Sequence, residues 1–80
     1  MQTGAISIDA MLSTLNATDV GTLDSIAAKL RQVKEQLEAL GQPDLAARAE
    51  SAIGSLEVGD VAAFKRTRAF LQSKIGHLRR

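Results

Sequence analysis

Apolar residues recur at alternating steps of three and four along residues 22–40, and no other feature constrains the fold of this chain as strongly. The members of this series are Leu23, Ile26, Leu30, Val33, Leu37 and Leu40. Their spacing places them on one side of an α-helix, because a helix turns once every 3.6 residues or so. The charged residues of the same stretch fall off this side. The stretch therefore predicts an amphipathic helix over about 22–40.

The residues at 41–44, "GQPD", end this helix and begin another. Gly41 suits the left-handed position that often follows a helix, and Pro43 has the fixed φ of a first helical turn. The second helix is expected over about 43–57. Its apolar side consists of Leu45, Ala49, Ala52, Ile53 and Leu56. The connection is so short that the two helices must be antiparallel.

A second break contains Gly59 and Asp60, and Asp60 is the expected N-cap of a helix over about 60–78. The apolar stripe of this last helix consists of Val61, Phe64, Leu71, Ile75 and Leu78, interrupted by Arg68. A short helix over about 6–15 is expected ahead of the other three. Its apolar residues are Ile8, Met11, Leu12 and Leu15.

The pattern as a whole predicts an all-α fold. The expected architecture is an up-down-up three-helix bundle of antiparallel helical hairpins, with the short N-terminal helix added to it. No linker or low-complexity segment divides the sequence, so residues 1–80 are interpreted as a single helical domain. A chain of this size buries a small core, and its stability is expected to be on the order of 5 kcal/mol.

Few side chains of this sequence can carry out chemistry. It has no Cys, Tyr or Trp, and His77 is its one histidine. The sequence pairs no nucleophile with a base and offers no thiolate metal site. Glu35 and Glu38 stand three residues apart, but a metal site needs further ligands. We expect a protein that is not an enzyme and that binds neither cofactor nor metal.

The sequence shows no sign of secretion or membrane insertion. A secretory signal has a basic region at its N-terminus, followed by an apolar region. In this sequence the first basic residue is Lys29, and Asp9 interrupts the N-terminal apolar residues. The longest apolar runs, such as 61–64, are far shorter than the roughly 18 residues that span a bilayer. A cytoplasmic protein that does not bind a membrane is therefore expected.

Charge is distributed unevenly along the chain. Residues 61–80 carry six basic and no acidic side chains, whereas residues 1–60 carry four basic and nine acidic ones. On a helical projection the bases surround the last helix, whereas a phosphate-binding helix normally gathers them on one face. The favoured interpretation is that this helix packs against acidic helices of its own fold. Binding of nucleic acid or another polyanion is the alternative.

Phe70 lies away from the apolar stripe of the last helix, among basic residues. Its ring is either at the edge of the core or an exposed docking point for a partner. Further apolar residues near the N-terminus exceed what a small core needs, and a second copy of the chain would cover them. The candidate partner-binding residues are Arg66, Phe70, Lys74, His77, Ile8, Met11 and Leu12.

These features predict a small helical protein-interaction module that works by packing helix on helix. It would act as an adaptor, a chaperone-like binder or a homo-oligomerising subunit, and its expected partner is another protein or a second copy of itself in a homo-dimer. The alternative function is weak binding of a polyanion or nucleic acid by the basic C-terminal helix.

One specific contact is also predicted. In an antiparallel pair of helices joined near Asp60, Arg68 is level with Glu50. An arginine can bury its methylene stem along an apolar stripe and direct its guanidinium to a carboxylate, so an Arg68–Glu50 ion pair is expected.

Overall fold

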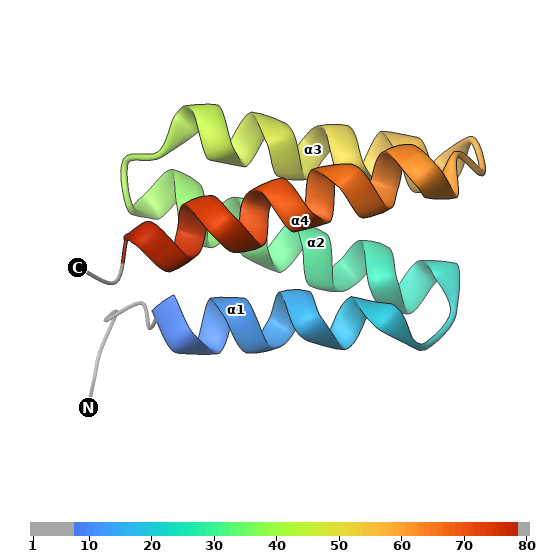
Figure 1. Cartoon of the computed structure of the whole chain (residues 1–80), viewed down its shortest axis with the longest axis horizontal. Coiled ribbons are helices and arrows are strands. Elements are labelled where there is room, and N and C mark those ends of the chain that lie inside the picture. The colour runs from blue at the N-terminus through green and yellow to red at the C-terminus, as the bar shows by residue number, and fades with distance from the viewer. Residues whose placement is uncertain (1–7, 79–80) are drawn as a thin grey trace.

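The computed structural model describes residues 8–78, except for the side chain of residue 19. Within this range the chain forms four α-helices, one short 3-10 helix and no strand (Figure 1). The elements are α1 (Ile8–Asn16), η1 (Ala17–Asp19), α2 (Leu23–Ala39), α3 (Pro43–Glu57) and α4 (Val61–His77). The predicted all-α fold is confirmed for this part of the chain. The predicted start of the first helix, at about residue 6, lies outside the described residues.

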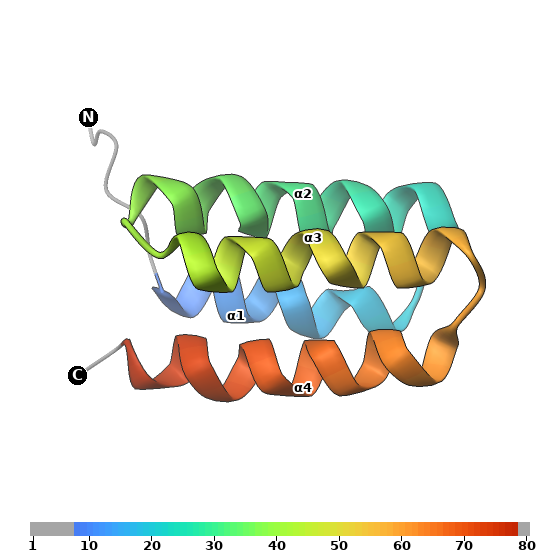
Figure 2. The same ribbon diagram turned by 90° about the horizontal axis from the view of Figure 1, so that it is seen from above.

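The helices form a bundle in which α1 is a full member. α2 packs against α3, α3 packs against α4, and α1 packs against both α2 and α4. The chain reverses its direction at each connection, so neighbouring helices run antiparallel (Figures 1 and 2). The sequence indicated three main helices with a short one added. In the structure α1 closes the bundle, because it fills the side between α2 and α4.

Capping residues set the ends of the helices as predicted. Gly41 and Gly59, which follow α2 and α3, have φ values of 75° and 79°. This left-handed region is costly for any residue with a Cβ. The Asp60 carboxylate accepts a hydrogen bond of 3.1 Å from the backbone N–H of Ala63 and so caps α4. These tight connections bring the start of α3 and the end of α4 to the same end of the bundle.

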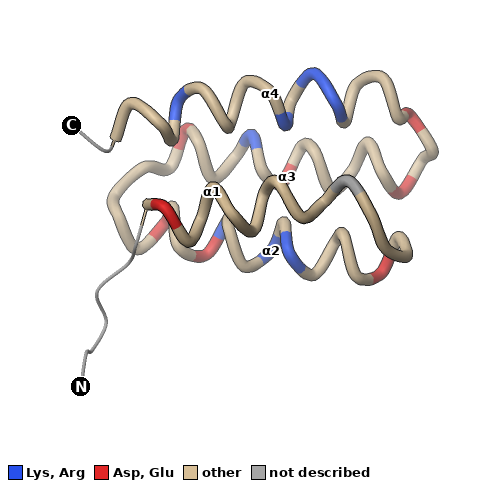
Figure 3. Tube along the Cα trace, turned by 60° about the horizontal axis from the view of Figure 1, so that its bottom comes forward, with Lys and Arg blue, Asp and Glu red and all other residues tan. Residues whose placement is uncertain are grey.

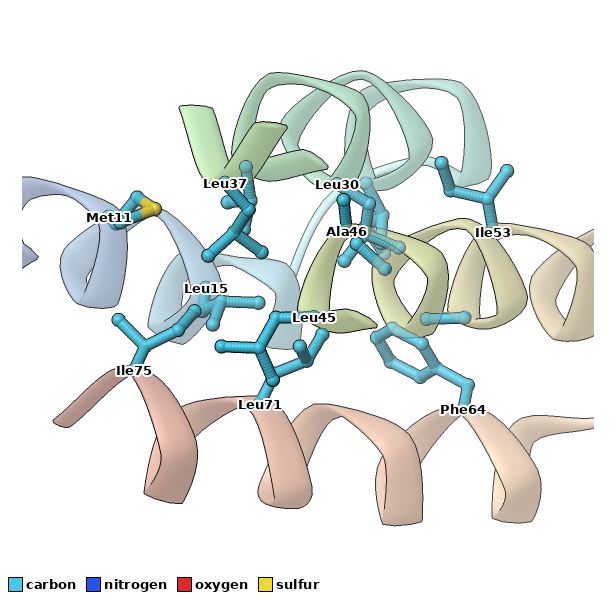
Figure 4. Close-up of a cluster of buried hydrophobic side chains, with 14 of the residues drawn as sticks. Met11, Leu15, Leu30, Leu37, Leu45, Ala46, Ile53, Phe64, Leu71 and Ile75 are labelled. Carbon is cyan, nitrogen blue, oxygen red and sulfur yellow. The ribbon is translucent and has the colours of Figure 1, made fainter. Parts of the chain in front are cut away.

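Apolar side chains from all four α-helices form the core (Figure 4). Met11 and Leu15 of α1 lie in one cluster with Leu71 and Ile75 of α4, and all four are fully buried. The other buried members are Ile26, Leu30, Val33, Leu37, Leu45, Ala46, Ala49, Ala52, Ile53, Leu56 and Phe64. The small alanines come from α3, and they let α3 approach its neighbours closely.

The outermost residues of two predicted stripes lie on the surface. Leu23 and Val61, the first residues of α2 and α4, are both exposed, as is Leu40 after the end of α2. Their spacing matches the helical period. They stand at the ends of the bundle, however, where fewer neighbours surround a side chain.

The predicted Arg68–Glu50 ion pair is wrong. Oε1 of Glu50 lies 2.9 Å from Nζ of Lys34 on α2, whereas Nη1 of Arg68 donates to Oγ1 of Thr18 at 3.5 Å. Thr18 belongs to η1, which follows α1, so Arg68 faces the side of the bundle that α1 and η1 occupy. Each member of the predicted pair therefore has a partner on a different neighbouring element.

Candidate partner-binding groove

A groove lies between the start of α3 and the end of α4, and we call it the α3–α4 groove. It encloses about 750 Å³. Its walls are formed by Gln42, Asp44, Leu45, Ala47 and Arg48 on one side and by Phe70, Lys74, His77 and Leu78 on the other. The tight connection at Gly59 brings these two segments together, because it makes α4 run back along α3.

Phe70 links the core to the groove. Its half-buried ring packs against the core and also lines the groove. The guanidinium carbon of Arg48 lies 4.3 Å from the ring centroid, and Nζ of Lys74 lies 5.6 Å from it. Cations within about 6 Å of a ring centroid are attracted to its π electrons. The ring therefore lies at the edge of the core and at the same time positions two cations beside the groove.

The basic groups of the groove have no acidic partner within the described part of the chain. Arg48, Lys74 and His77 are exposed, and none of them forms an ion pair with a described Asp or Glu. Asp44 is the one acid among the described lining residues. Cations beside an apolar wall attract carboxylates more strongly than cations in open water do. The groove therefore favours an anionic partner that also has an apolar part.

The structure brings together three of the predicted partner-binding residues. Phe70, Lys74 and His77 all line the α3–α4 groove. Arg66 is exposed but is not among the residues that line the groove. It stands on the same helix, nearer the α3–α4 connection.

The predicted partner-binding residues of α1 are covered by the chain itself. Met11 has no exposed surface, and Ile8 and Leu12 pack half-buried against the core. The expectation that Met11 is free to bind a partner is wrong, because α1 packs between α2 and α4 and directs this side chain inward (Figure 4). The monomer therefore supplies the cover that a dimer was expected to provide for Met11.

Arg48 is the groove residue that the sequence pattern did not reveal. A signal for it exists in the register of the hairpin. Gly59 stands eleven residues after Arg48 and eleven residues before Phe70. A helical hairpin that folds at Gly59 therefore places Arg48 and Phe70 at the same level.

Residues 8–78 contain neither a group of side chains that could hold a metal ion nor a helix that could span a membrane. No group of three or more His, Cys, Asp or Glu side chains is arranged to hold a metal ion in this range. Nor is any helix there both long and apolar enough to cross a membrane.

Comparison of the chain with protein-family models, with curated proteins and with solved structures finds no match. The residues of the groove therefore carry the functional assignment.

Proposed function

We propose that this protein is a non-enzymatic helical protein-interaction module that binds an acidic segment of a partner protein in the α3–α4 groove. One observation carries the proposal. Arg48 and Lys74 lie beside the half-buried ring of Phe70, His77 lines the same groove, and none of the three is paired with a described acid.

The groove suits a few side chains of a partner and not a broad surface. Its volume of about 750 Å³ lies within the range of roughly 300–1,000 Å³ that is typical of sites enclosing a small ligand. An apolar side chain of the partner would displace water from Leu45, Phe70 and Leu78. Flanking carboxylates would pair with Arg48 and Lys74. Because the phenyl ring already holds the guanidinium, less side-chain freedom is lost on binding.

The lining residues favour binding over catalysis. None of the nine described lining residues has a hydroxyl or a thiol group. The described lining therefore offers no Ser, Thr, Tyr or Cys nucleophile to stand beside the imidazole of His77.

The alternative function, polyanion binding by α4, has less support because the bases of this helix have different surroundings. Lys74 lines the groove, and Arg68 donates to Thr18. Lys65 and Arg66 are exposed outside the groove. A phosphate backbone is bound best by bases in one continuous row.

Fluorescence anisotropy with a labelled peptide tests the proposal. The probe is a short peptide in which leucines are flanked by glutamates, and its control has glutamine at each glutamate position. We expect the acidic peptide to bind with a Kd on the order of 100 μM or tighter, and the control peptide to bind at least about fivefold more weakly.

Variants of α4 locate the binding site. Lys74→Gln and Phe70→Leu are each expected to weaken peptide binding about fivefold, since each removes one partner of a cation–π contact and part of the groove wall. Arg66→Gln removes an exposed base outside the groove and is expected to leave binding unchanged. Equal losses in Lys74→Gln and Arg66→Gln would overturn the proposal. So would an oligonucleotide that binds more tightly than the peptide and dissociates steeply with salt.

A further inference from the structure

Large apolar side chains are exposed at the end of the bundle that lies opposite the α3–α4 groove. They are Val20, Leu23, Val58 and Val61, with 71%, 61%, 80% and 51% of their surface exposed. Val20 and Val58 lie in the α1–α2 and α3–α4 connections, and Leu23 and Val61 are the first residues of the helices that follow. Both connections lie at the same end of the bundle (Figure 1). An end of the bundle with several exposed apolar side chains offers apolar surface that a partner can cover.

The α3–α4 connection holds its exposed side chain in a fixed conformation. The backbone N–H groups of Gly59 and Asp60 donate to the carbonyls of Leu56 and Ser55 at 3.1 and 2.8 Å. Gly59 supplies the positive φ that this tight turn requires. Val58 is therefore presented to solvent by a rigid turn, so little conformational entropy is lost when it docks.

Each of the two valines of this turn follows an acidic residue in the sequence, Glu57 before Val58 and Asp60 before Val61. Glu57 and Asp60 are exposed, and neither forms an ion pair with a described base. Figure 3 shows acidic positions where α3 passes into α4, and basic positions on α4 both in the half nearer this turn and towards its far end. The turn is thus an acidic segment with Val58 and Val61 as apolar anchors. This is the chemistry that the α3–α4 groove favours.

The turn cannot reach the groove of its own chain. The groove is lined by residues of the start of α3 as far as Arg48, and the turn follows the end of α3. Residues 49–57 lie between Arg48 and Val58 and hold them about 15 Å apart along the helix axis. The rigid helix pair keeps the two features at opposite ends of a bundle that is 37 Å long. A second copy of the chain is free of this restriction.

We propose that the occupant of the α3–α4 groove is the α3–α4 turn of a second copy. Val58 inserts against Phe70 and Leu78 of the neighbouring copy, and Glu57 and Asp60 approach its Arg48 and Lys74. This inference rests on the proposed function, because it assigns the partner of the same groove.

The contact joins different surfaces of the two copies. A pair that is joined by one such contact retains one free turn and one free groove, to which further copies add head to tail. Such association grows with concentration and does not stop at a symmetric dimer. It also has a diagnostic property. A chain with a defective turn and a chain with a defective groove can still form one contact, between the intact turn of one and the intact groove of the other.

Sedimentation equilibrium with two complementary variants tests the proposal. The turn variant carries Glu57→Lys and Val58→Ser, and both positions are exposed. Residue 57 is the last residue of α3, where a lysine interacts favourably with the helix dipole. The groove variant carries Lys74→Glu, also at an exposed position. The control is Arg66→Glu, which changes an exposed base of α4 that does not line the groove.

We expect the mean mass of the wild type to rise above the chain mass of 8.5 kDa between about 10 μM and about 1 mM, the range in which weak contacts become populated. Arg66→Glu should behave like the wild type. Each of the other two variants should stay at the chain mass when alone. Their equimolar mixture should approach twice the chain mass and go no further.

Three results would overturn the inference: a wild type that stays monomeric, a mixture that stays monomeric while the wild type associates, or a single variant that associates like the wild type. The anisotropy assay with the glutamate–leucine peptide separates this failure from failure of the proposed function. A monomeric wild type that binds the peptide retains the proposed function with another partner. A wild type that neither binds the peptide nor associates overturns both.

Discussion

Lys34 of α2 and Glu50 of α3 form an ion pair in which Nζ and Oε1 lie 2.9 Å apart. The hydrogen bond from Lys34 to Glu50, followed by the charge of Glu50, raises the pKa of Lys34 above its ordinary value of 10.5, and Glu38 and Glu35 add to this effect. Because the pKa is higher in the folded than in the unfolded chain, the pair stabilises the fold fully below pH 10.5. Its contribution is lost as pH rises through the folded pKa.

Alkaline unfolding is therefore expected to depend on Glu50. The chain has no Tyr or Cys, so lysine is the side chain that titrates between about pH 9 and about pH 12. We expect the urea midpoint of the wild type to decrease as the pH is raised through this range. The midpoint of Glu50→Gln should be slightly lower than that of the wild type at neutral pH and should decrease less. Glu57→Gln, which removes an exposed acid of the same helix, should follow the wild type. Identical pH profiles for the wild type and Glu50→Gln would contradict the prediction.

Arg68→Ala is expected to destabilise the fold by about 1 kcal/mol whether or not Glu50 is present. The half-buried side chain lies with its guanidinium carbon 5.4 Å from the ring centroid of Phe64 and donates to Thr18. Truncation therefore removes packing as well as a polar contact, and Arg68→Leu, which keeps much of the packing, should cost less. Urea melts of Arg68→Ala, Glu50→Gln and the double variant measure the coupling. A coupling energy above about 0.5 kcal/mol would show that the two residues interact after all.

Gln36→Met is expected to stabilise the protein by about 1 kcal/mol. Oε1 of Gln36 is buried, and no donor within the described residues reaches it. A buried acceptor without a hydrogen bond loses its hydration and gains nothing in return, whereas a thioether of similar length does not carry this cost. Gln32→Met, at an exposed position of the same helix, is the matched control. Thermal or urea unfolding that shows equal effects at both positions would refute this explanation.

Leu15→Ala is expected to cost about 3 kcal/mol, because it opens a cavity at a fully buried position of α1. This is a large share of the stability of a chain of this size. Leu23→Ala makes the same chemical change at an exposed position of α2 and should cost less than about 1 kcal/mol. Urea denaturation compares the two variants directly. If both cost equally little, α1 does not pack in the core as described.

The helices themselves follow from local signals that the sequence displays. α3 spans Pro43–Glu57, the range that its apolar period and its two glycine breaks predict. Asp60 caps α4 because its short carboxylate reaches the free N–H groups of the first turn, and this depends only on neighbouring residues. Signals of this kind need no knowledge of the rest of the chain.

The way each helix faces its neighbours is not encoded so locally. Counting from Gly59, Arg48 is level with Phe70 and Glu50 is level with Arg68. The first pair meets across the α3–α4 groove, but the second does not, since Arg68 turns towards Thr18. The position of the turn sets the level of a residue. The rotation of α4 about its own axis sets the direction in which each of its side chains points. This rotation depends on α1, which also packs against α4.

The ring of helix contacts also has a consequence for how the chain folds. Three of its four contacts join consecutive helices through short connections, whereas the contact of α1 with α4 encloses residues 17–60 between them. Closing that long segment costs more chain entropy than forming any of the local pairs. We expect folding on the microsecond to millisecond timescale, with the packing of Met11 and Leu15 against α4 among the last steps. Weakening these contacts would then speed unfolding more than it slows folding.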